Sequence, residues 1–195
     1  LGAQQSRRFS LNMESNPTSL AGWYNEASIQ SVTWDLYDAA SDSSDAVALG
    51  YKPLYEAFTG RLRTGPALTS LYPFVTDLKG RAGAPVSAID TLVTSQNIHV
   101  VDEWGTNETN DGAVPRILPL YAQLALNGGA QSVCGTTAVG TYNKIGNRFF
   151  LRFSLAAARE VTVRAQYSAA GSTAPFSPES DPDIVLYGNG FLDIA

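Results

Sequence analysis

Histidine and cysteine are almost absent from this chain, which has one of each in 195 residues. The lone cysteine, Cys134, excludes an internal disulfide bond and a metal site built from several thiolates. The lone histidine, His99, excludes a His-Glu-x-x-His zinc site, because that motif needs two imidazoles one helical turn apart. The chain therefore lacks the residues for this kind of hydrolysis on its own.

Other catalytic and nucleotide-binding signatures are also missing from the sequence. It contains no Gly-x-Ser-x-Gly nucleophile elbow, no Gly-x-x-x-x-Gly-Lys phosphate loop and no Gly-x-Gly-x-x-Gly turn. A Ser-His-Asp triad would have to use His99. A thiol hydrolase would need Cys134 beside His99, whereas the simpler interpretation of Cys134 is a buried small hydrophobic residue.

Charge is scarce too, since charged residues make up 16% of the chain and the net charge is −5. The lysines and arginines are scattered, which argues against binding to nucleic acid. No apolar run is long enough for a transmembrane helix, and no signal peptide is visible. Because the chain starts at Leu1 rather than Met, we expect its natural N-terminus to lie upstream. Polarity carried by Ser, Thr, Asn and Gly suggests an exported protein, secreted or located in the periplasm or at the cell surface.

Helical periodicity dominates the first half of the chain. Apolar residues at helical spacing predict four helices, over residues 20–38, 53–58, 69–79 and 86–96. Gly60 to Pro66 is expected to break the second helix, and Thr69 or Ser70 to cap the third. A short extended run follows at residues 98–101, and then a loop rich in Gly, Asn and Asp.

After residue 141, apolar residues recur at every second position instead of at helical spacing. Two segments alternate, with Phe149, Leu151, Phe153 and Leu155 on one face of the first and Val161, Val163, Ala165 and Tyr167 on one face of the second. Residues 184–187 and 191–194 are candidate further strands. So few strands cannot close a sandwich, so more are expected downstream. The predicted fold is α+β: a helical segment over residues 1–140, followed by an incomplete antiparallel β-sandwich over 141–195.

The acidic residues of the first predicted helix and of the loop after it are the candidate site residues. Glu26 is either a first-turn carboxylate stabilised by the helix dipole or a residue of a metal or substrate site. Four aspartates follow at spacings of three and four residues, which is compatible with a Ca²⁺ site as well as with a solvated acidic loop. They are Asp35, Asp38, Asp42 and Asp45. We expect His99 to have its hydrogen bonds satisfied or to lie at the surface. Roles in turns and caps are expected for Asp102, Glu103 and Glu108.

Two stretches carry a resemblance to known families. Residues 25–38, which include Asn25-Glu26 and Trp34-Asp35-Leu36-Tyr37-Asp38, resemble a segment of secreted bacterial zinc-metallopeptidase-like proteins, as do Asp45 and Thr69-Ser70-Leu71. Residues 147–153 and 181–187 are similar to the bacterial pre-peptidase C-terminal domain, a small β-sandwich appended to secreted peptidases.

The first resemblance implies that zinc is bound by a His-Glu-x-x-His helix and a Glu-Gly motif upstream of this segment, and that the helix over residues 25–38 packs in the helical catalytic region. Glu26 is the one position that it places near an active site. We therefore expect part of an exported zinc-dependent peptidase acting on peptide or protein substrates, inactive by itself. The alternative is a non-catalytic exported module for adhesion or for binding carbohydrate or protein.

Overall fold

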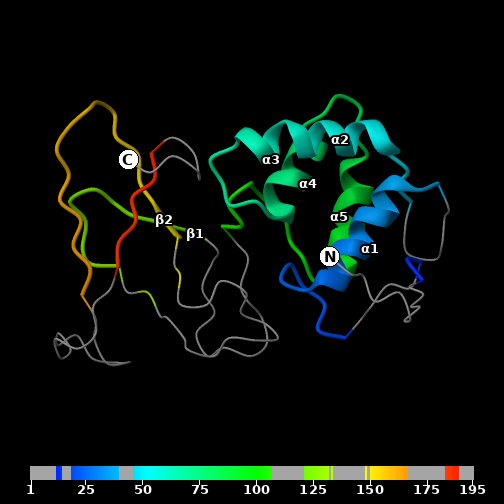
Figure 1. The fold of residues 1–195 in the computed structure, drawn as a ribbon, viewed down its shortest axis with the longest axis horizontal. Helices are drawn as coiled ribbons and strands as arrows, with labels where there is room; N and C mark the ends of the chain where they lie inside the picture. Colours follow the sequence, from blue (N-terminus) through cyan, green and yellow to red (C-terminus); the bar gives the residue numbers. More distant parts are fainter. Residues whose placement is uncertain are drawn as a thin grey trace, which may run out of the picture.

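Five helices and one pair of short strands make up the described part of the chain. The computed structural model describes residues 12–14, 19–39, 46–106, 121–131, 133, 148, 150–166 and 183–188. The helices gather in one body, and the strands lie to one side of it (Figure 1). This mixture of helix and strand confirms the α+β class, whereas the antiparallel sandwich is wrong, as shown below.

The first helix, α1 (Glu26–Tyr37), begins at Glu26 rather than at Leu20. Asn25 determines this start, because its Oδ1 accepts a hydrogen bond from the Ala27 N–H at 2.9 Å. Its Nδ2 donates to the Leu20 carbonyl at 2.9 Å, which holds the preceding loop against the cap. Leu20 itself has a φ of 58°, which is incompatible with a right-handed helix.

Helix α1 buries a face that is half polar. Val32 and Leu36 enter the core as predicted, whereas Ile29 and Thr33 are only partly buried. The remaining buried positions of this face are polar, namely Ser28, Ser31 and Asp35. The Ser28 hydroxyl accepts the Gly22 N–H at 3.2 Å, so part of this polar face fastens the loop that precedes the helix.

Helix α2 (Tyr51–Thr59) is followed at once by the short helix α3 (Arg61–Thr64), which the sequence did not predict. Pro53 lies in the first turn of α2, where its missing N–H costs nothing. Gly60 ends α2, and its N–H donates to the Glu56 carbonyl at 2.9 Å. The chain then turns into α3 instead of leaving the helical body.

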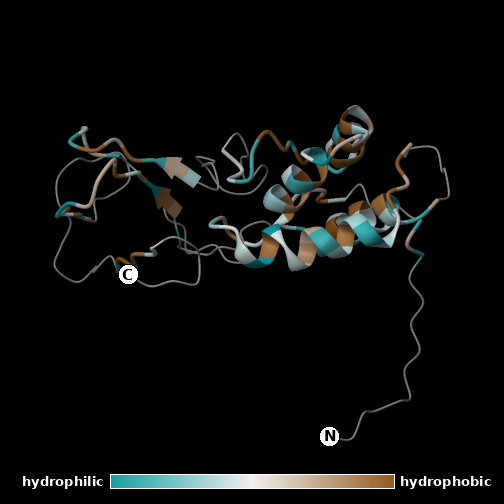
Figure 2. Ribbon diagram, turned by 90° about the horizontal axis from the view of Figure 1, so that it is seen from above, coloured by the Kyte–Doolittle hydropathy of each residue, from teal (hydrophilic) through white to brown (hydrophobic). Residues whose placement is uncertain are grey.

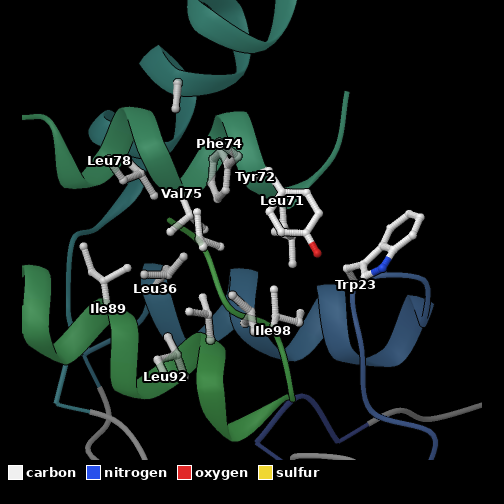
Figure 3. Packing of buried hydrophobic residues seen from close by; sticks show 14 of the residues in the cluster. Trp23, Leu36, Leu71, Tyr72, Phe74, Val75, Leu78, Ile89, Leu92 and Ile98 are labelled. Atoms are coloured by element: carbon white, nitrogen blue, oxygen red, sulfur yellow. The ribbon is translucent and has the colours of Figure 1, made fainter. Parts of the chain in front are cut away.

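Helices α4 (Leu71–Lys79) and α5 (Val86–Ser95) confirm the predicted periodicity. Ser70 caps α4 by accepting the Tyr72 N–H at 3.4 Å, and Gly80 ends it. The core packs between α4, α5 and α1 (Figure 3). Its largest fully buried apolar side chains are Tyr72, Phe74, Leu36, Leu78, Ile89, Leu92 and Ile98.

The two strands, β1 (Tyr121–Gln123) and β2 (Phe150–Arg152), pair in parallel, not antiparallel. The predicted inward face is also shifted by one residue, because Leu151 is 37% exposed while Phe150 packs against the core. Exposure does alternate along β2, but both faces carry large side chains, and a shift of one residue exchanges the two faces. Phe150 is inside because its ring meets Tyr121 of the paired strand.

The remaining predicted strands are wrong where the structure describes them. Residues 161–166 form no strand and are exposed to solvent, and 183–188 contribute one isolated bridge residue, Tyr187. Beside the strand pair, Figure 2 shows loops with hydrophobic stretches, and in the described residues β1 and β2 form the only sheet. Tyr167 and residues 191–194 lie outside the described residues. The sandwich implied by the pre-peptidase resemblance is therefore not formed by the described residues.

The division at residue 140 stays a prediction, although β1 and β2 pair across it. Within the described ranges, none of the helices has the length and apolar character needed to cross a membrane.

Substituting Leu36 with alanine should strongly destabilise the helical body. Leu36 belongs to the core, on a helix that contacts α2 and α5, so the change removes buried methyl groups and leaves a cavity. Denaturant unfolding should show a loss of about 2–5 kcal/mol. The matched control is Leu186→Ala, an exposed leucine, which should change the free energy of unfolding by less than about 0.5 kcal/mol. Equal losses in the two variants would contradict this core.

Candidate functional site

Glu26, the candidate active-site residue, is the first residue of α1 and lies exposed at the helix surface. The Gln30 side chain donates to its Oε1 at 3.5 Å, one turn further along the helix. A carboxylate in this position interacts favourably with the positive end of the helix dipole. Its position in the first turn of α1 is therefore confirmed, whereas stabilisation by the dipole and a role near an active site stay predictions.

The four aspartates of the predicted calcium site are only partly described. Asp35 is buried on the core-facing side of α1, whereas Asp38 follows the last residue of the helix as its C-cap. Asp42 and Asp45 lie outside the described residues. Where side chains are described, no three His, Cys, Asp or Glu residues gather as a metal-binding group. The calcium site therefore stays a prediction.

His99 lies on the exposed side of an extended segment in which its neighbours Ile98 and Val100 are buried. This alternation agrees with the extended run predicted at residues 98–101, although no strand forms there. A surface position for His99 is confirmed. Cys134 lies outside the described residues, so the thiol hydrolase hypothesis stays untested.

One group of interacting aromatic and charged side chains lies where the strand pair meets the helical body. We call it the aromatic junction, and it consists of Trp104, Tyr121, Phe150 and Arg152. Its members come from the loop after α5, from β1 and from β2, so they lie far apart in the sequence. The three aromatic residues pack in or against the main core. This makes the aromatic junction the candidate site that the structure itself presents.

Tyr121 lies at the centre of the aromatic junction. Its ring packs edge-on to Trp104, with centroids 5.0 Å apart, and tilted against Phe150 at 5.2 Å. Its hydroxyl accepts the Leu68 N–H at 3.1 Å, which links β1 to the turn before α4. Burial raises the pKa of the Tyr121 phenol above 10, so it stays neutral over the physiological range.

Arg152 closes the aromatic junction from the side of β2. Its guanidinium carbon lies 4.4 Å from the centroid of the Trp104 ring, a cation–π contact typically worth about 0.5–1 kcal/mol at partly exposed sites. The same positive charge acts on Asp102 and favours its ionised form. One side chain therefore holds β2 to the helical body and also stabilises the loop after α5.

Asp102 organises that loop by accepting three hydrogen bonds. They come from the Trp104 N–H at 2.9 Å, the Thr106 N–H at 3.2 Å and the Thr106 hydroxyl at 2.6 Å. Burial opposes ionisation of Asp102, but the Thr106 hydroxyl, the two backbone N–H groups and the Arg152 charge together lower its pKa below 3.8. The predicted turn chemistry of this residue is confirmed.

An ion pair from α3 and a hydrogen bond from α4 attach the same loop to the helices. The Arg61 Nε donates to Glu103 Oε2 at 2.7 Å, and a second guanidinium nitrogen binds the same oxygen, which joins α3 to the loop. Lys79 at the end of α4 binds Asp90 at 2.5 Å and the Val100 carbonyl at 2.9 Å. The carboxylates around the aromatic junction are thus engaged in turns and ion pairs. The arrangement is better suited to holding the loop and β2 on the helical body than to proton transfer.

The sequence indicated Asp102 and Glu103 but not the four residues of the aromatic junction. No pattern joins Tyr121, Phe150 and Arg152 to Trp104, because each contact is between segments distant in the chain. The only signal was composition, since Trp104 is one of three tryptophans.

No protein-family model matches the chain, and neither curated proteins nor solved structures show significant similarity to it. Function is therefore argued from the residues and their geometry, since a fold alone would not decide it.

Replacing Asp102 with asparagine should lower stability at neutral pH and weaken its dependence on acid. The folded-state pKa of Asp102 lies below 3.8, so its contribution is fully present above that value and is lost as the pH falls through the lower folded-state pKa. Urea unfolding from pH 7 down to pH 3 should show the two proteins converging at low pH. Thr106→Val removes one of the three donors and should give a smaller loss in the same direction. A constant difference at every pH would contradict this role.

Proposed function

We propose that this chain is a non-catalytic part of an exported zinc-dependent peptidase-like protein, in which its helices form a wall of the substrate cleft. The supporting observation is the packing of the segment that resembles this family. Residues 26–37 of that segment form α1, and Val32 and Leu36 pack into one core with α4 and α5. This is the role that the resemblance implies for the helix.

The exposure of Glu26 suits the same proposal. It lies on the surface at the start of α1, while the opposite end of the helix is capped by Asp38. A carboxylate in this position is accessible to a substrate or to another part of the parent protein. The low content of charged residues and the abundance of Ser, Thr and Asn support export, to the periplasm, the cell surface or the medium.

The residues of this chain do not fit the zinc centre of such an enzyme. A site of the His-Glu-x-x-His type needs two imidazoles, and the sequence has only His99. His99 is exposed, and in the described ranges no group of metal-binding side chains surrounds it. Under the proposal the zinc ligands belong to polypeptide outside these 195 residues, and no catalytic step is assigned to this chain.

A second candidate is an exported binding module without catalytic activity. It is favoured by one observation, the exposure of three aromatic side chains on α2, which are Tyr51, Tyr55 and Phe58. Exposed aromatic surface of this kind commonly marks a contact site. The two candidates are compatible, because a wall of a substrate cleft can also carry a binding face.

The purified chain should bind no zinc stoichiometrically and should cleave no peptide. Zinc content after dialysis and cleavage of unfolded casein, with and without a chelator, measure this directly. Stoichiometric zinc together with chelator-sensitive cleavage would contradict the proposal.

The coding sequence that flanks this chain in its gene supplies the complementary test. A His-Glu-x-x-His motif upstream is expected, and its absence would favour the binding module. In the longer protein, Glu26→Gln should lower peptidase activity without changing zinc content. The control Glu160→Gln, at an exposed glutamate outside α1, should leave activity unchanged.

A further inference from the structure

Helix α2 presents an aromatic stripe, which consists of Tyr51, Tyr55 and Phe58. The three side chains are 67%, 51% and 47% exposed. Their spacing of four and then three residues places them on one side of the helix. The adjoining side supplies Leu54 and Ala57 to the core. The aromatic stripe therefore borders the buried face, and its rings remain about half or more exposed to solvent.

The aromatic stripe is ordered by contacts among its own rings and with the core. Tyr51 and Tyr55 stack on each other, with centroids 5.5 Å apart and planes 26° apart. Phe58 stacks on the buried ring of Phe74, with centroids 4.7 Å apart. Rings held in this way lose little conformational entropy on binding, because each has only two side-chain torsions.

Positive charge flanks the aromatic stripe, although the chain as a whole is acidic. Residues 51–64 carry three cationic side chains, on Lys52, Arg61 and Arg63, against one carboxylate, on Glu56, while the net charge of the chain is −5. The Lys52 side chain is 85% exposed, and its 3.8 Å contact with Glu56 is a weak surface pair. Glu56 is held more closely by Arg81, at 2.5 Å.

Arg63 is a second exposed cation of this surface. It is exposed on α3 and makes no ion pair within the described part of the chain, whereas Arg61 is paired with Glu103. Helices α2 and α3 follow one another along the same edge of the helical body (Figure 1). The surface of α2 and α3 therefore combines exposed aromatic rings with the exposed cations of Lys52 and Arg63. This combination complements a ligand that is anionic and has apolar flat faces.

We propose that the aromatic stripe binds an acidic polysaccharide. The C–H faces of sugar rings pack on the ring faces of Tyr51 and Tyr55 that the stacking of the two tyrosines leaves open. Carboxylates of uronic acid units pair with Lys52 and Arg63. An acidic peptide is less suitable, because the side of a helix has no free backbone N–H or C=O groups with which an extended chain could pair.

This inference does not depend on the peptidase proposal, since it concerns binding by the chain alone. Oligogalacturonate is the probe, titrated into the isotope-labelled chain at low ionic strength and followed by NMR. Resonances of α2 should shift, and affinity should fall as salt is added. Tyr51→Ser combined with Tyr55→Ser should weaken binding about tenfold, as should Lys52→Gln combined with Arg63→Gln.

The matched control is Tyr37→Ser, which removes a tyrosine that is 44% exposed on α1 and should leave affinity unchanged. Thermal unfolding verifies that each variant is folded. The proposal is overturned if oligogalacturonate shifts no α2 resonances at millimolar concentration, or if the double tyrosine variant binds normally. It is also overturned if neutral malto-oligosaccharides or polyglutamate bind as tightly, since then sugar rings and charge are not both recognised.

Discussion

Burial of α4 on nearly every side is the constraint on which the rest of the structure depends. Six of its nine residues are buried, and a helix that is apolar around most of its circumference must be enclosed by other elements. Helices α2, α3 and α5 all contact α4, and α1 completes the core through α5. The C-terminal end of α4 is held by Lys79, which binds Asp90 on α5. The outer side of α2 is left exposed because its inner side is occupied in covering α4.

Local patterns predicted the helices well and the strands poorly. Helices α4 and α5 were found because a period of 3.6 is decided by residues within a few turns of each other. The start of α1 was missed because the Asn25 cap overrode the apolar residues before it. The β region failed for a different reason. Phe150 and Leu151 are both large and apolar, so alternation could not say which faces inward until the partner strand was known.

The same distinction separates the site residues that were predicted from those that were not. Asp102 bonds groups two and four residues away, so its turn was predictable from the sequence. The contact of Arg152 with Trp104 depends on pairing of β2 with a strand that no pattern revealed. On α2, the helical spacing of Tyr51, Tyr55 and Phe58 would equally fit the buried face of the helix. Only the position of α4 shows that the smaller residues Leu54 and Ala57 face inward.

The parallel register of β1 and β2 has a consequence for the order of assembly. Residues 124–149 must connect the two strands, and bringing the ends of such a segment together has an entropic cost before any pairing contributes. A pair with three residues in each strand offers little to offset that cost. We therefore expect the packing of Tyr121 against the helical body to support the pairing. We expect the helices to fold before the strand pair, because more of their contacts are close in sequence. Amide hydrogen exchange should then be slowest in α4 and fastest in β2.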